Sequence, residues 1–196
     1  MIADLPEDVK KFLLTYDSID QLTRLAQGEL NKIYGLLEIE LTKQPWFSAT
    51  EFQTATSWKW FQVWKKHWQP SVTQYCPWIH FEYTLSWPNK WVQVSVDIES
   101  HGIASRDATL SVAEKLRQTL SKNGPKFIEN QGWLLRPTLE ENRMVLLNRC
   151  TVDDEKFSAE WILQTGKNLF EQLSELIPYV DGIVKDLFGE QQTEVK

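Results

Sequence analysis

Two neighbouring stretches in the middle of the chain alternate strictly between apolar and polar residues. The apolar residues are Ile79, Phe81, Tyr83 and Leu85 in the first stretch, and Val92, Val94, Val96 and Ile98 in the second. Residues 88–90, with the sequence Pro-Asn-Lys, separate the two stretches. Because successive side chains of a strand point to opposite faces of a sheet, this pattern predicts a β-hairpin with one buried face.

The chain after this hairpin repeats the same order of elements. A helix is predicted over residues 108–122, a second hairpin over 132–152, and a last helix from Ser158 that Pro178 kinks or breaks. Two hairpin-helix units in tandem predict an α+β fold, in which helices cover an antiparallel four-stranded sheet.

The N-terminal part of the chain carries helical patterns. One helix is predicted to begin at Pro6, and a second after Ser18, where Ser18 and Gln21 have the spacing of a capping box. A third helical region is predicted from Ser48 to Pro70. The sequence therefore predicts an N-terminal helical segment before the first hairpin.

Length and composition are those of one globular domain. The chain has 196 residues, of which 42% are hydrophobic and 24% charged. We expect this domain over residues 1–188, with the helical segment at 1–70, the hairpin-helix units at 71–188 and a frayed tail at 189–196. The start lacks the pattern of a signal peptide, and no apolar run reaches the roughly 18 residues that span a bilayer. With two cysteines and no disulfide framework, we expect a reduced, cytoplasmic protein without membrane contact.

Tryptophan is concentrated in one region: eight of the ten lie between Trp46 and Trp91. On a helical wheel, Trp60, Trp64 and Trp68 share one sector with Phe61, while Lys59, Gln62 and Lys66 lie opposite. The pattern predicts an amphipathic helix over residues 58–68 that packs its aromatic stripe on the sheet. The predicted partner-binding residues are Trp46, Trp58 and Trp78, at edges or in connections, together with Lys59 and Lys66.

The charges are distributed unevenly along the chain, whose net charge is -6. Residues 101–150 carry eight basic and five acidic groups, whereas residues 151–196 carry four basic and ten acidic groups. A mildly basic centre with acidic ends argues against general nucleic-acid binding, which needs a coherent positive field. We expect the acidic C-terminal helix to pack beside the basic centre.

The polar face of the first hairpin carries the weak catalytic candidates His80, Glu82, Asp97 and Glu99. Pairing Leu85 with Val94 would place Glu82 opposite Asp97, and such a pair of carboxylates would need a cation or a raised pKa. Pairing Leu85 with Val92 places His80 opposite Asp97 and avoids the repulsion, so it is favoured if no metal is bound. Metal-dependent nucleases carry a lysine two residues after such acids, but His101 stands there. A solvated sheet face explains these residues equally well, so we predict no metal and no cofactor.

Two further interpretations have weak support. Cys76 and His80, with His67 and Cys150 elsewhere, lack the ligand spacing of a zinc site. The nucleic-acid alternative uses Lys65, Arg136, Arg143 and Arg149, together with Lys59 and Lys66, to contact phosphates. A simpler interpretation is that the three arginines pair with acidic residues on neighbouring elements.

The second part of the chain resembles an accessory domain found beside restriction-like nuclease domains in prokaryotic defence-associated proteins. The matching segments are strands at 79–83 and 96–99, a helix from Ala113 to Leu120, the sequence Gly132-Trp133-Leu134, and a closing helix with Trp161. The nuclease catalytic half has no counterpart here. The resemblance implies a prokaryotic binding or accessory role.

Together these observations favour a non-enzymatic binding or regulatory protein whose partner is another protein. The alternative is a nucleic-acid-binding or metal-dependent, nuclease-like protein. The sequence contains no phosphate loop, dinucleotide fingerprint or nucleophile motif.

Overall fold

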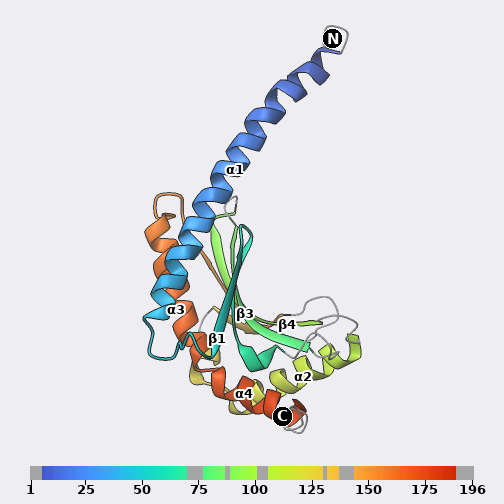
Figure 1. Cartoon of the computed structure of the whole chain (residues 1–196), viewed down its shortest axis with the longest axis vertical. Helices are drawn as coiled ribbons and strands as arrows, with labels where there is room; N and C mark the ends of the chain where they lie inside the picture. The colour runs from blue at the N-terminus through green and yellow to red at the C-terminus, as the bar shows by residue number, and fades with distance from the viewer. Residues whose placement is uncertain are drawn as a thin grey trace.

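The computed structural model describes residues 6–69, 77–86, 89–100, 106–129, 132–136 and 144–188 (Figure 1). Its α-helices are α1 (Glu7–Thr42), α2 (Arg106–Asn123), α3 (Ala159–Ser174) and α4 (Ile177–Phe188). Its strands are β1 (Phe52–Ser57), β2 (Trp60–Lys65), β3 (Pro77–Ser86), β4 (Trp91–Ser100), β5 (Trp133–Leu135) and β6 (Met144–Thr151). Two 3-10 helices, η1 (Lys66–Trp68) and η2 (Lys126–Glu129), lie in connections. The predicted tail at 189–196 lies outside the described residues.

The strands form one antiparallel sheet in the order β1-β2-β3-β4-β6-β5. The α+β class and both predicted hairpins are confirmed, because β3 pairs with β4 and β5 with β6. The predicted number of four strands is wrong, since β1 and β2 add two strands at the edge of β3. The expected turn of the second hairpin at residues 139–142 lies outside the described residues.

The helical region predicted from Ser48 to Pro70, which includes the amphipathic helix over residues 58–68, is wrong, so the predicted helical segment over residues 1–70 is helical only as far as Thr42. The region forms β1, β2 and η1 instead. Residues four apart share a face in a helix and also in a strand, so the spacing of Trp60, Trp64 and Trp68 fits both. Strand alternation is hidden in β2 because both of its faces are covered. Phe61 and Val63 are buried on one face, and Trp64 is buried on the other.

The register between β3 and β4 is the one that avoids opposed carboxylates. Leu85 pairs with Val92, which places His80 opposite Asp97 and Glu82 opposite Ser95. This confirms the register that was favoured because it avoids like-charge repulsion. His80, Glu82, Ser95 and Asp97 therefore lie on the same face of the sheet. The opposite, apolar face carries Phe81 and Tyr83.

The apolar face of the sheet packs against α1 and α3. Tyr34 of α1 contacts the rings of Phe61 and Tyr83, and Phe170 of α3 contacts the same two rings. The Tyr83 hydroxyl donates to the carbonyl oxygen of Ile162 in α3, at 2.9 Å. These contacts fix the two helices against the same two strands.

The N-terminal helices predicted before residue 42 are one continuous helix, α1, and Ser18 lies inside it. Its C-terminal half, from Leu30 to Leu41, is buried on one side, whereas the N-terminal half projects away from the sheet (Figure 1). At 1.5 Å per residue, residues 7–27 extend over about 30 Å.

The end of the chain folds as the sequence predicts. The Ser158 hydroxyl caps α3 by accepting a hydrogen bond from the amide of Trp161, at 3.2 Å. The expected interruption at Pro178 is confirmed, because α3 ends at Ser174 and α4 begins at Ile177. Proline suits the start of a helix, where its missing N–H leaves no hydrogen bond unmade.

Candidate functional site

The projecting half of α1 exposes apolar side chains. Of the nine large apolar residues that are exposed in the described part of the chain, seven lie on α1. Five of them lie in the projecting half, namely Val9, Tyr16, Ile19, Leu22 and Leu25, and two lie on the outer side of the C-terminal half, namely Leu36 and Ile39. Leu22 is 66% exposed and Ile19 is 54% exposed, and exposed apolar residues that lie close together can mark an interaction surface.

Three of the exposed residues, Val9, Tyr16 and Ile19, continue rows that are buried in the second half of α1, whereas the other four lie outside these rows. Residues 9, 16, 23, 30 and 37 are spaced by seven, as are residues 19, 26 and 33, and such rows follow one face of a helix. Leu30, Ile33 and Leu37 of these rows are buried in the core. We call the continuation of this face, formed by Tyr16, Ile19, Leu22, Thr23 and Ala26, the α1 face.

A pocket lies where the α1 face meets the body of the protein. Its volume is about 530 Å³, and its lining is predominantly apolar. Helix α1 contributes Thr23, Ala26 and Leu30, and the sheet contributes Trp58 and Trp91, among other residues. The α1 face and this pocket therefore form one continuous surface.

The predicted partner-binding tryptophans differ in exposure. Trp58 is 42% exposed at the turn between β1 and β2, with the Lys59 ammonium 4.9 Å from the centre of an indole ring. Trp46 is half-buried against Phe52. Trp78 was expected at an edge, but it lies in an interior strand and is buried. Of the three, only Trp58 lies beside the pocket and the α1 face.

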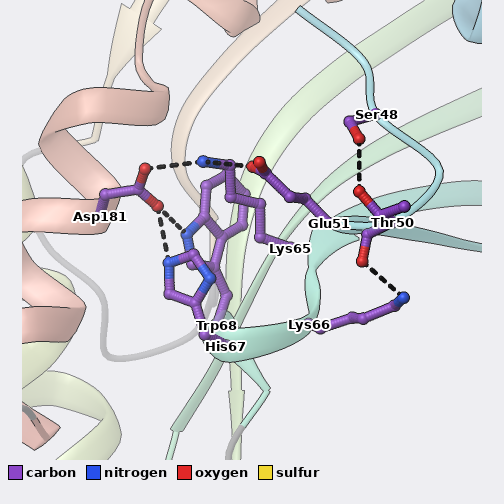
Figure 2. Close-up of polar contacts among 8 residues, drawn as sticks. All are labelled: Ser48, Thr50, Glu51, Lys65, Lys66, His67, Trp68 and Asp181. Carbon is purple, nitrogen blue, oxygen red and sulfur yellow. Dashed lines mark hydrogen bonds and ion pairs between the residues drawn. The ribbon is translucent and has the colours of Figure 1, made fainter.

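The predicted basic residues Lys65 and Lys66 make local contacts with neighbouring side chains and backbone (Figure 2). Asp181 of α4 accepts hydrogen bonds from Lys65 at 2.8 Å and from the Trp68 indole at 2.6 Å, and His67 lies 2.9 Å away. Lys65 also lies 3.3 Å from Glu51. Lys66 donates to the carbonyl oxygen of Thr50 at 2.6 Å, and the hydroxyls of Thr50 and Ser48 lie 2.8 Å apart.

Asp181 is ionised within this cluster. Burial acts to raise its pKa, but the hydrogen bonds from Lys65 and Trp68 outweigh burial, so the pKa is lowered. Asp186 of the same helix pairs with Lys115 of α2 at 3.1 Å. The expectation that the acidic C-terminal helix packs beside basic residues is therefore confirmed.

Arg149, one of the arginines of the nucleic-acid alternative, has other partners than these lysines. Arg149 lies over the indole of Trp91 at 4.3 Å and donates to Gln93 at 2.7 and 3.1 Å, so its partner is an amide and not the expected acid. Arg136 is half-buried, and Arg143 lies outside the described residues. Lys59 and Lys65 lie at opposite ends of β2.

A second candidate site lies on the polar face of the sheet. The Gln62 amide donates to Glu82 at 2.8 Å and lies 3.1 Å from Nε2 of His80, which is itself 3.6 Å from the Glu82 carboxylate. His80, Glu82 and Asp97 each place one atom capable of binding a metal within 4.8 Å of the others. This group does not include Glu99, although Glu99 is on the same strand and face.

Burial affects the two carboxyl groups of this cluster differently. It raises the pKa of Asp97 to about 7, although the charge of His80 opposes this effect. For Glu82, burial also acts to raise the pKa, but hydrogen bonds from His80 and Gln62 outweigh it and the pKa is lowered. At neutral pH, Glu82 is therefore ionised while Asp97 is partly protonated.

The zinc interpretation based on cysteines is not supported by the arrangement of the described residues. His67 contacts Asp181, and Cys150 lies 3.4 Å from the Asn148 side chain. His80 lies on β3 with Glu82 and Asp97 as its neighbours. Cys76 lies outside the described residues.

The sequence does not predict two features of these candidate sites. The sequence pattern places Gln62 in a helix, so the contact of Gln62 with His80 cannot be inferred from it. The spacing of residues 9, 16, 23, 30 and 37 was present in the sequence, but a pattern of apolar residues does not show which of them the fold covers.

Comparison with other proteins gives no family for this chain. No protein-family model, curated protein or solved structure matches it. Among the described helices, none combines the length and apolar character that a membrane crossing requires.

Proposed function

We propose that the protein is a binding protein that docks an amphipathic helix of another protein along the α1 face and into the pocket beside Trp58. The observation that carries this proposal is the continuation of one set of apolar rows from the core onto the projecting half of α1. A helix with apolar residues at the same spacing would pack against these rows.

The available apolar surface supports specific association. Fully burying a Leu or Ile side chain contributes roughly 1.5–3 kcal/mol, so Ile19 and Leu22 together supply several kcal/mol before the cost of association. Trp58 adds a large, partly exposed ring beside the pocket. Tryptophans in such positions are frequent anchors of protein interfaces.

The small residues of the α1 face favour a different protein over a second copy of this chain. Thr23 and Ala26 lie at neighbouring positions of the two rows, and both line the pocket. In a parallel, in-register pair of identical helices, each small residue would face its own copy and leave a poorly filled space. A partner with a large apolar residue at this level would fill the pocket.

Two ion pairs form within α1 close to the α1 face. Arg24 lies 2.8 Å from Asp20, and Lys32 lies 2.6 Å from Glu29. These pairs leave little net charge near the apolar rows, which favours recognition by shape and apolar contact over binding to phosphates. The accessory role that the family resemblance implies is compatible with this proposal.

Photo-cross-linking in the native host tests the proposal. A photoreactive amino acid replaces Ile19 on the α1 face or, as the matched control, Ile39. Both are isoleucines of α1, with exposures of 54% and 53%, but they lie about 160° apart around the helix. We expect a discrete adduct with one other protein from position 19 and none from position 39.

Three outcomes would contradict the proposal. An adduct between two copies of this chain would identify the α1 face as a surface for self-association. Equal adducts from positions 19 and 39 would indicate non-specific contact. No adduct from either position in the native host would mean that the α1 face has no stable partner.

A further inference from the structure

The polar face of the sheet carries a cluster that is arranged for a cation. His80 and Asp97 face each other across β3 and β4, and Glu82 lies two residues along β3 on the same face. One potential ligand atom from each of the three lies within 4.8 Å of the others. Ligands about 2.1 Å from a zinc ion are about 3.4 Å apart, so small side-chain rotations would bring the three together.

Two buried atoms of this cluster have no hydrogen-bond partner among the described residues: Nδ1 of His80 and Oδ1 of Asp97. His80 is fully buried, and Asp97 is 9% exposed. The hydroxyl oxygen of Ser95, beside them on β4, has no partner within hydrogen-bond distance among the described residues, although it lies close enough to Asp97 to act on the pKa of that carboxyl group. Buried polar atoms without partners are costly, and a bound ion is one of the few things that would satisfy several of them together.

We propose that His80, Glu82 and Asp97 bind one divalent transition-metal ion of the zinc type, a site that the sequence analysis did not predict. One imidazole and two carboxylates suit zinc better than magnesium or calcium, which prefer oxygen ligands alone. Three protein ligands leave a further position for water, as in zinc sites with an open coordination position.

Gln62 would hold the histidine in place for the metal. If Nδ1 of His80 binds the ion, Nε2 carries the proton and requires an acceptor. Gln62 lies 3.1 Å away, and after a half-turn of its amide group it would present its oxygen to this proton. This turn would break the hydrogen bond that the Gln62 amide donates to Glu82, and Glu82 would bind the ion instead. Metal-binding histidines are commonly oriented by such a partner. The ion would also balance the negative charge of two carboxylates that share a buried face.

Titration of Zn²⁺ into the metal-free full chain, followed by calorimetry, tests the site. All proteins carry Cys76→Ser and Cys150→Ser, so that thiols do not bind the metal. We expect one Zn²⁺ per chain in this parent protein. Removing a partner of a metal ligand costs about 10–100-fold in affinity, so removing a ligand by Asp97→Asn or His80→Gln should cost at least that much.

Glu99→Gln is the matched control, because Glu99 lies on the same strand and face as Asp97 but outside the group of three. Its Zn²⁺ affinity should equal that of the parent. Zn²⁺ should raise the unfolding temperature of the parent and of Glu99→Gln, but not that of Asp97→Asn. Absence of Zn²⁺ binding by the parent, or a loss of less than about tenfold in Asp97→Asn, would overturn the proposal.

The Asp97→Asn protein should fold, so the Zn²⁺ titration can be interpreted even if the His80→Gln protein does not fold. Burial raises the pKa of Asp97 from its ordinary value of about 4 to about 7. Between these values the folded chain binds more protons than the unfolded chain, so the metal-free parent loses stability as the pH rises. A neutral amide avoids this loss, and we expect a higher unfolding temperature for Asp97→Asn than for the metal-free parent at about pH 8.

Discussion

The two halves of α1 carry the same apolar pattern but have different surroundings. In the C-terminal half, Leu37 is fully buried against the body, and Tyr34 contacts rings of both β2 and β3. In the N-terminal half, Ile19 and Leu22 continue the face but remain exposed. One helix therefore contains both a part that stabilises the fold and a part that does not.

The comparison shows that the pattern of a helix does not determine its role. Rows spaced by seven residues specify a face that packs against another element, but not whether that element belongs to the same chain. Here α3 and the sheet cover only the second half. An exposed continuation of a core face is the kind of surface that another protein covers.

Leu37→Ala and Leu22→Ala should give the largest contrast between the two halves. Leu37→Ala leaves a cavity in a fully buried position and should lower the free energy of unfolding by about 2–5 kcal/mol. Leu22→Ala should change it by less than about 0.5 kcal/mol, because the side chain is 66% exposed. Urea unfolding measures both. Equal losses would mean that the projecting half is covered within this chain.

Gly166→Ala tests how tightly α3 packs against the buried half of α1. A Cβ atom here would lie 3.0 Å from Tyr83 and 3.3 Å from Leu37. Both neighbours are fully buried, and the Tyr83 hydroxyl is held by Ile162, so they have little room to move. Overpacking should outweigh the better helix propensity of alanine and cost about 1–2 kcal/mol by thermal unfolding. An increase in stability would show that this contact is loose.

Gly28→Ala is the corresponding change near the exposed half, and it should have the opposite sign. No atom lies within 4 Å of a Cβ atom built at this position. The substitution should therefore stabilise α1 by about 0.5–1 kcal/mol through helix propensity alone. Circular dichroism during thermal unfolding measures this gain, and a loss would indicate a close contact at this level of the helix.

Ile19→Asn should have the smallest effect on the isolated protein. Since Ile19 is 54% exposed, we expect a change in unfolding free energy of less than about 0.5 kcal/mol. Ile39→Asn, at 53% exposure, is the control and should behave alike. Denaturant unfolding of the two variants checks this, and a large loss for Ile19→Asn alone would show that the α1 face is part of the core.

The sequence predicts the first hairpin well because the interactions that determine this hairpin are local. Strict alternation identifies the buried face, and repulsion between Glu82 and Asp97 selects the register with Leu85 opposite Val92. The cap at Ser158 and the interruption before Pro178 are local signals of the same kind. Each depends on residues that are close in the sequence or directly opposite in one hairpin.

The sequence fails where the tertiary environment decides. The segment with Trp60, Trp64 and Trp68 lacks visible alternation because both faces of β2 are covered, and no glycine, proline or asparagine marks its turn at Trp58. Once β2 is misassigned, the contact of Gln62 with His80 cannot be found. The exposure of Ile19 likewise depends on how far the rest of the chain extends along α1.

Thiol labelling is the most direct test of whether the α1 face is covered by a partner. Ile19→Cys and Ile39→Cys, each combined with Cys76→Ser and Cys150→Ser, are labelled with a maleimide as purified proteins and in native host extract. We expect similar rates for the purified proteins, and in the extract about tenfold or greater protection of position 19 alone, as when its side chain is buried at an interface. Equal labelling of both positions in the extract would contradict the account.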